Sequence, residues 1–212
     1  MSHRTSIQSG VAALPTGEVW MAGEYDIVGH NPGPTLITAL CPIHVSDAGF
    51  EPASARATPN TQLFWSLDPM NTMSHTITDG SGLDLFDSGP KGPGTSFSVS
   101  YFAAGTYEVL DSATSNSSVI QVRMSAVPPS GSTTTIFTVR WASVVAPVDF
   151  KYRVQIKRPG ERSFGDWFVG LARSRTFLPD GGVGTYAFRG RLERISSGAS
   201  SGWSPTVSIR VS

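Results

Sequence analysis

The sequence predicts an all-β protein built from two β-sandwiches that follow an N-terminal β-hairpin segment. Charged residues make up only 15% of the 212 residues, and Gly (22) and Pro (15) are abundant. Soluble domains carry roughly 25% charged residues, and chains rich in Ser, Thr, Gly and aromatic side chains favour strands and turns. Short alternating runs recur about every eight to twelve residues, whereas no stretch keeps apolar residues at helical spacing.

The chain divides into four segments. Residues 1–42 hold isolated apolar patches, and residues 43–126 give a first run of alternating strands. Residues 127–133 read Val-Pro-Pro-Ser-Gly-Ser-Thr, a composition typical of a stiff polar linker. Residues 134–212 give a second set of strands. We therefore expect one domain on either side of residues 127–133.

The charge balance argues against two classes of partner. The 16 Lys and Arg residues are matched by 16 Asp and Glu residues, so the net charge is zero. Nucleic acids and anionic membranes are usually bound by a clustered excess of basic residues. We expect no nucleic-acid partner. Because no run of about 18 apolar residues occurs, we expect no membrane-spanning helix either.

Cysteine usage and the start of the sequence bear on location. Cys41 is the only cysteine, so no internal disulfide can form. No apolar run follows the basic residue near Met1, so the start does not resemble a signal peptide. The low charge and the Ser- and Thr-rich loops resemble those of secreted bacterial modules. We therefore expect a piece of a longer exported chain, located outside the cell or at its surface.

The first sandwich resembles the plastocyanin-like cupredoxins of bacteria. The resemblance is carried by six blocks in the expected order, at residues 50–55, 63–65, 74–78, 85–89, 94–98 and 104–107. It implies a Greek-key β-sandwich over residues 43–126. Turn-forming Gly and Asp residues separate the blocks, and Phe97 and Tyr107 are expected to point inward.

The same resemblance implies that a copper site has been lost. His75 matches the first histidine ligand of the copper-binding relatives. Asp111 falls where the cysteine should be and Thr114 where the second histidine should be, and the loop to Gln121 contains no Met. A blue-copper centre needs two His, one Cys and a weak axial thioether. We therefore exclude type-1 copper and electron transfer.

His75 leaves three interpretations open. It is a structural histidine that holds the former ligand loop, or it pairs with Asp111 to bind a metal ion, with Asp84 and Asp87 nearby. Such nitrogen and oxygen donors suit Zn²⁺, Mn²⁺ or Ca²⁺. The third interpretation is an acid–base pair. The expectation is no cofactor, with Ca or Zn as the alternative.

The second sandwich resembles a fibronectin type III domain. Trp141 follows an alternating strand as the B-strand tryptophan does, and residues 150–156 alternate as a C strand. Tyr186 stands where the resemblance implies a tyrosine corner. Outward arginines stacked on Trp203 or Trp167 are expected as packing, with a sugar-binding aromatic platform as the alternative.

The N-terminal segment resembles one blade segment of the repeat β-propellers found in large secreted bacterial proteins. The resemblance is carried by residues 10–25 and 35–37. The pattern occurs once, and one blade cannot form a propeller. Its hairpin must therefore fold onto the first sandwich, pair with another chain or stay exposed. An unpaired edge of this kind makes a homo-oligomer through the hairpin a further expectation.

The leading function is a non-catalytic, extracellular-type module for adhesion, binding or scaffolding, with a protein or glycan ligand. Two binding folds without a complete catalytic constellation favour it, although fold alone does not establish function. The first alternative is a metal-dependent hydrolase of small esters, lactones or glycosides that uses His75 and Asp111. The second alternative is a structural protein of a virion or surface filament.

Overall fold

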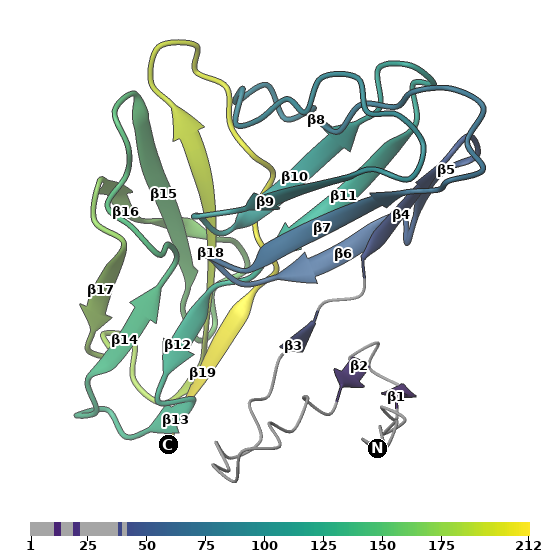
Figure 1. Cartoon of the computed structure of the whole chain (residues 1–212). Helices are drawn as coiled ribbons and strands as arrows, with labels where there is room; N and C mark the ends of the chain where they lie inside the picture. The colour runs from purple at the N-terminus through teal and green to yellow at the C-terminus, as the bar shows by residue number, and fades with distance from the viewer. Residues whose placement is uncertain (1–10, 14–18, 22–37, 40–41) are drawn as a thin grey trace, which may run out of the picture. The chain divides into compact units, whose positions relative to one another are not determined.

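A computed structural model describes residues 11–13, 19–21, 38–39 and 42–212 (Figure 1). Every helix or strand assigned in these residues is a β-strand, as the sequence predicts. In this part of the chain no helix has the length and apolar character needed to cross a membrane. The chain separates into two compact units, residues 1–42 and 43–212.

The first unit contains a small antiparallel sheet. β1 (Val11–Ala13) pairs with β2 (Val19–Met21), and β2 pairs with β3 (Thr38–Ala39). Val11 lies opposite Met21 and Val19 lies opposite Ala39. The predicted hairpin is therefore present, and a third strand extends it. The apolar patch at residues 35–37 and the cysteine at position 41 lie outside the described residues.

The second unit begins with a sandwich of two four-stranded sheets. One sheet has the order β5 (Gly49–Glu51), β4 (Ile43–Ser46), β7 (Gln62–Leu67), β9 (Ser96–Ser100). The other has the order β6 (Ser54–Ala57), β11 (Ser117–Val122), β10 (Gly105–Leu110), β8 (Thr78–Asp79). The β4–β7 and β6–β11 pairs are parallel, and the other pairs are antiparallel. This is the cupredoxin-like arrangement expected from the sequence.

Strand alternation fills the interior of this sandwich. In β7 the inward positions Leu63, Trp65 and Leu67 are buried, and Tyr107 and Val109 of β10 are buried in the same way. The Tyr107 hydroxyl donates a hydrogen bond of 2.8 Å to the carbonyl of Ala103. A buried phenol with a backbone acceptor satisfies its polar atom while contributing a large apolar area.

The second sandwich is fibronectin type III-like, with a three-stranded and a five-stranded sheet. The first has the order β12 (Ser125–Val127), β14 (Phe137–Arg140), β17 (Ser174–Phe177). The second has the order β13 (Ser130–Gly131), β19 (Val207–Val211), β18 (Gly184–Arg194), β15 (Phe150–Lys157), β16 (Gly165–Gly170).

The tyrosine corner is present in this sandwich. The Tyr186 hydroxyl donates to the carbonyl of Gly182 at 2.8 Å and accepts the N–H of Gly181 at 2.8 Å. Trp141 is buried, and its indole N–H donates to the carbonyl of Ala172 at 2.7 Å. Both residues therefore occupy the structural roles that the sequence resemblance implies.

The stretch 127–133 differs from its expectation as a linker, because it contributes to the sheets of the second sandwich. Val127 ends β12, which pairs with β14. Ser130 and Gly131 form β13, which pairs in parallel with β19 opposite Arg210 and Val211. The prolines between these two short strands carry no N–H for a ladder. They mark the point where the chain passes from one sheet to the other rather than a gap between domains.

Backbone hydrogen bonds join the two sandwiches into one compact unit. The N–H of Ala104 donates to the carbonyl of Trp141 at 2.7 Å, and the N–H of Ser143 donates to the carbonyl of Phe102 at 2.9 Å. Thr106 and Gly202 exchange two further backbone bonds of 2.9 and 2.8 Å. The relative orientation of the sandwiches is therefore fixed by strand-like pairing.

Candidate functional site

His75 lies between two carboxylates in the first sandwich. Its Nδ1 is 2.7 Å from an Asp111 carboxylate oxygen, and its Nε2 is 3.0 Å from an Asp47 carboxylate oxygen. The side chains of His75 and Asp111 are 0% and 1% exposed, whereas that of Asp47 is 37% exposed. The contact of His75 with Asp111, which the sequence left open among three interpretations, is therefore present, and Asp47 is a second partner that no sequence pattern indicated.

The backbone around His75 is fixed by an isolated bridge to a second loop. The His75 N–H donates to the carbonyl of Lys91 at 3.0 Å, and the Lys91 N–H donates to the carbonyl of His75 at 2.8 Å. The imidazole is consequently presented from the chain between β7 and β8, with its backbone already bonded. A ring held in this way loses little further freedom when it makes its two side-chain bonds.

Asp111 is held by a cluster of donors at the end of β10. One carboxylate oxygen accepts the Thr114 hydroxyl at 2.6 Å, and the other accepts the N–H groups of Thr76 at 2.8 Å and Ala113 at 3.1 Å. The two positions that match the lost cysteine and second histidine therefore hydrogen-bond to each other. Hydrogen bonds to a carboxylate favour its charged form.

Asp47 lies in the turn between β4 and β5. One of its oxygens accepts the Thr72 hydroxyl at 2.7 Å and the Thr72 N–H at 2.9 Å. The N–H of Asp47 in turn donates to the side-chain carbonyl of Asn71 at 3.1 Å. These polar contacts thus join the turn to the loop before His75, and no local sequence motif predicts them.

The contacts of both ring nitrogens with carboxylate oxygens favour the imidazolium form of His75. A neutral imidazole carries one N–H, so one of its nitrogens would place a lone pair against a carboxylate oxygen. Burial by itself lowers the pKa of His75, but the hydrogen bonds and charges of Asp111 and Asp47 outweigh it and raise the net pKa above the ordinary 6.5. Burial raises the pKa of Asp111, yet bonds from Thr114, Thr76 and His75 bring it below 3.8. Bonds from Thr72 and His75 likewise lower the pKa of Asp47.

This charge state predicts a specific pH dependence of stability. Because the pKa of His75 is raised on folding, its contribution is complete below pH 6.5 and is lost as the pH rises through the folded-state value. The free energy of unfolding of the wild type relative to His75→Asn should therefore be larger at pH 6 than at pH 9. Chemical denaturation at both pH values measures this difference, with the exposed His44→Asn as the matched control.

NMR of the His75 ring provides an independent check of that prediction. Both ring nitrogens should be protonated at pH 5, well below the ordinary pKa of 6.5. A single protonated nitrogen there, or a wild-type advantage over His75→Asn that grows from pH 6 to pH 9, would contradict the imidazolium assignment. At acidic pH, the free energy of unfolding depends on Asp111. Its stabilising contribution is present above pH 3.8 and is lost as the pH falls through its lowered pKa.

Asp84 and Asp87, which were expected near the former ligand loop, do not join His75. Asp84 pairs with Arg194 of the second sandwich, so it takes part in the contact between the two domains. Asp87 accepts the Thr78 hydroxyl at 3.0 Å and the Gly89 N–H at 2.9 Å, which closes a local turn. Neither carboxylate forms a hydrogen bond or an ion pair with His75, whose partners are Asp47 and Asp111.

The residues at the positions of the copper ligands do not match the donor set of blue copper. Asp111 and Thr114 replace the thiolate and the second imidazole that type-1 copper needs. Both nitrogens of His75 are engaged by carboxylates. Among residues 42–212 and the short described segments before them, no three His, Cys, Asp or Glu side chains form a group that could hold a metal ion.

The outward arginines of the second sandwich stack on aromatic rings, as expected. The Arg189 and Arg191 guanidinium groups lie 4.5 and 4.6 Å from the Trp203 ring centre, and Arg189 is also 4.3 Å from that of Phe164. Arg175 lies 5.7 Å from the ring centre of Trp167. Rings covered by guanidinium groups are packing elements and leave less area for stacking against a sugar.

Fold and site together define a two-sandwich, all-β chain with a cupredoxin-like and a fibronectin type III-like domain. No family model and no curated protein matches the sequence.

Similar solved structures include the Novel Purple Cupredoxin from Nitrosopumilus maritimus (21% identity, TM-score 0.36, 39% of this chain and 99% of that chain). They also include the FN1–FN3 domains of chicken CNTN1 (11% identity, TM-score 0.33, 80% of this chain and 67% of that chain). A cytokine receptor complex matches at 16% identity and TM-score 0.31, over 73% of this chain and 92% of that chain. The architecture itself rests on the strand pairing described above.

Proposed function

We propose that the protein is a non-catalytic, extracellular-type recognition or scaffolding module whose former copper site has become a structural ion cluster. The observation that carries the proposal is the closed Asp47–His75–Asp111 cluster, in which the imidazolium lies between two carboxylates. In a copper-binding relative the cation would be a metal. Here the protonated side chain of His75 is itself the cation.

The same contacts occupy the groups of His75 and Asp111 that catalysis would need. A general base needs a free lone pair and a general acid needs a proton it can deliver to substrate. Both nitrogens of His75 are bonded within the protein and its side chain is 0% exposed. Asp111 is 1% exposed and accepts at least four hydrogen bonds. Neither group has a position open to a substrate, which supports binding rather than turnover.

The rigid pairing of the sandwiches supports a recognition role. Two loosely linked domains would sample many orientations, whereas backbone bonds between Ala104 and Trp141 and between Thr106 and Gly202 fix one. Surfaces that span both domains are then presented in a constant arrangement, and preorganisation of this kind reduces the entropy lost on binding.

Elemental analysis of the purified protein tests the proposal. We expect no stoichiometric Zn, Ca, Mn or Cu in the wild type, and the same result for His75→Gln, which removes the imidazole. A divalent ion at one per chain that is lost in His75→Gln would overturn the proposal and favour the metal-dependent hydrolase. Loss of esterase, lactonase or glycosidase turnover on adding a chelator would do the same.

A further inference from the structure

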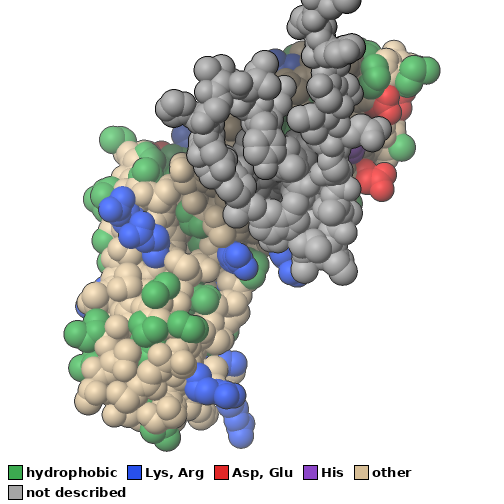
Figure 2. Space-filling view, turned by 60° about the horizontal axis from the view of Figure 1, so that its bottom comes forward, with side chains coloured by type: hydrophobic (Ala, Val, Ile, Leu, Met, Phe, Trp, Pro, Cys, Tyr) green, Lys and Arg blue, Asp and Glu red, His purple; other side chains and the backbone are tan. Residues whose placement is uncertain are grey.

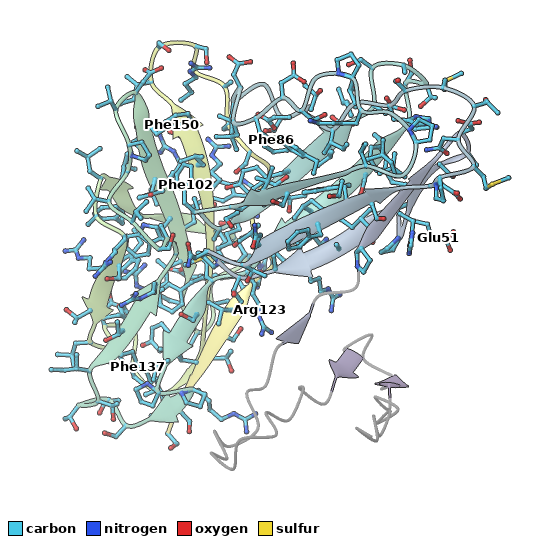
Figure 3. The ribbon with its side chains drawn as sticks, in the orientation of Figure 1. Glu51, Phe86, Phe102, Arg123, Phe137 and Phe150 are labelled. Atoms are coloured by element: carbon cyan, nitrogen blue, oxygen red, sulfur yellow. The ribbon has the colours of Figure 1, made fainter. Side chains whose placement is uncertain are left out.

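We infer that a basic groove at the junction of the two sandwiches is a binding site for an anionic polysaccharide. The inference deepens the proposed function and rests on it. The groove encloses about 950 Å³ and is lined by segments of both sandwiches. Its charged lining residues are three arginines, Arg56, Arg123 and Arg140, and it has no acidic lining residue. Figure 3 shows Arg123 where β11 leads from the first sandwich toward the second.

Strand geometry places the three guanidinium groups on one surface. In β6 and β11, Ala57 and Val122 pair and are buried, so their neighbours Arg56 and Arg123 face outward. Arg123 is two residues beyond Gln121, the register partner of Arg56, which makes the two arginines diagonal neighbours. Both arginines therefore lie on the same face of the sheet.

The third arginine comes from the second sandwich. Arg140 in β14 pairs in register with Ser125, two residues after Arg123 on the continuous chain. Arg140 and Ser125 are exposed, whereas the residue before each of them in the chain, Val139 and Met124, is buried. The outward face of residues 121–125 therefore connects the arginines of the first sandwich with that of the second.

In the described part of the chain, the three groove arginines are not ion-paired, unlike Arg153, Arg158 and Arg194, although several other exposed arginines also lack an ion pair. Arg153, Arg158 and Arg194 each contact one or more carboxylates. Within the described residues, Arg56, Arg123 and Arg140 form no ion pair. Like charges brought together on one sheet face destabilise it unless an anion lies between them. The groove therefore presents uncompensated positive charge in a protein whose net charge is zero.

The rest of the lining points to a sugar polymer. Hydroxyl and amide side chains surround the arginines: Thr58, Asn60, Gln121, Ser125, Ser143, Thr206 and Ser208. Such groups match sugar hydroxyls, and arginine matches carboxylate or sulfate. No aromatic side chain lines the groove, so it offers no stacking platform for single-stranded nucleic acid or a neutral sugar face. Figure 2 shows Lys and Arg side chains in separate places on the face in view.

The walls of the groove are fixed relative to each other. Ala142 and Ser143 on the second-sandwich side belong to the segment that pairs with residues 102–104 of the first sandwich. The ligand therefore meets a formed groove rather than two independent surfaces. The groove loses little conformational entropy when a ligand binds. This small entropic cost favours measurable affinity for a ligand held by only three cations.

Calorimetric titration of the full chain with polygalacturonate and with dextran sulfate tests the inference. We expect binding of at least one probe that weakens as salt is raised. Each single change, Arg56→Gln, Arg123→Gln or Arg140→Gln, should lower the affinity about tenfold, and the triple variant should abolish it. The matched control is the triple variant Arg162→Gln, Arg175→Gln, Arg210→Gln, which removes the same charge from exposed arginines outside the groove.

Three outcomes would overturn the inference. The first is no binding of either polysaccharide. The second is equal loss of binding in the groove variant and the control variant, which would show a response to net charge alone. The third is equally strong, groove-dependent binding of polyglutamate or single-stranded DNA. Each leaves the proposed non-catalytic function standing, because that proposal fails only on metal content or turnover.

Discussion

Replacing Asp111 with alanine should lower the free energy of unfolding by about 3–5 kcal/mol, the usual cost of removing one partner of a buried ion pair. The change leaves the buried imidazolium of His75 with only the half-exposed Asp47. It also removes the acceptor of the Thr76 and Ala113 N–H groups and of the Thr114 hydroxyl. Chemical denaturation near pH 7 measures the loss.

Two comparison variants separate this effect from the loss of any carboxylate. Asp87→Ala removes an exposed turn carboxylate with two hydrogen bonds and should cost only about 1 kcal/mol. Asp111→Asn keeps the size of the side chain and an acceptor oxygen but removes the charge, so its cost should fall between the other two. Equal costs for Asp111→Ala and Asp87→Ala would contradict a structural ion cluster.

Replacing Trp141 with alanine should also lower the free energy of unfolding by about 3–5 kcal/mol, the range for large aromatic residues in a core. Trp141 is buried, lies 4.8 Å from Phe168 between ring centres, and donates its indole N–H to Ala172. Its backbone carbonyl accepts the N–H of Ala104 from the first sandwich. We therefore expect the change to destabilise both sandwiches in one transition.

Amide hydrogen exchange resolves the two sandwiches. In the variant, protection should fall by the same free energy in β7 of the first sandwich and in β18 of the second. Trp203→Ala is the comparison, because Trp203 is only partly buried and its arginine stacking is worth about 1–2 kcal/mol. Loss of protection confined to β18 would show that the sandwiches unfold separately, against the coupling inferred from their shared hydrogen bonds.

The sequence determines much of the fold because alternation and turn chemistry are local. The period of two in residues 63–67 and 150–156 places side chains inside or outside a sheet without reference to the rest of the chain. The tyrosine corner at Tyr186 follows from a similarly local pattern. The short strands within residues 125–131 were not predicted, because a run of prolines and serines is typical of a linker and the partner strands are distant in the sequence.

Part of the candidate site could likewise be predicted from the sequence, and part of it could not. That Asp111 and Thr114 stand where the resemblance implies copper ligands follows from residue types and their order. The sequence offered the pairing of His75 with Asp111 as one of three interpretations, and only the loop geometry shows that the two side chains meet. Asp47 lies 28 positions before His75 in a turn with no motif, and only folding brings its carboxylate to the second ring nitrogen.

The tertiary structure also determines that Asp84 pairs with Arg194 rather than with His75, because Arg194 lies 110 positions away in the sequence. The basic groove also exists only in three dimensions, because its arginines come from β6, from β14 and from the segment between β11 and β12. The sequence therefore determined the strands and the inward faces, which depend on neighbouring residues. The tertiary structure alone decided which charges meet, because electrostatic partners are selected by distance in space rather than by distance along the chain.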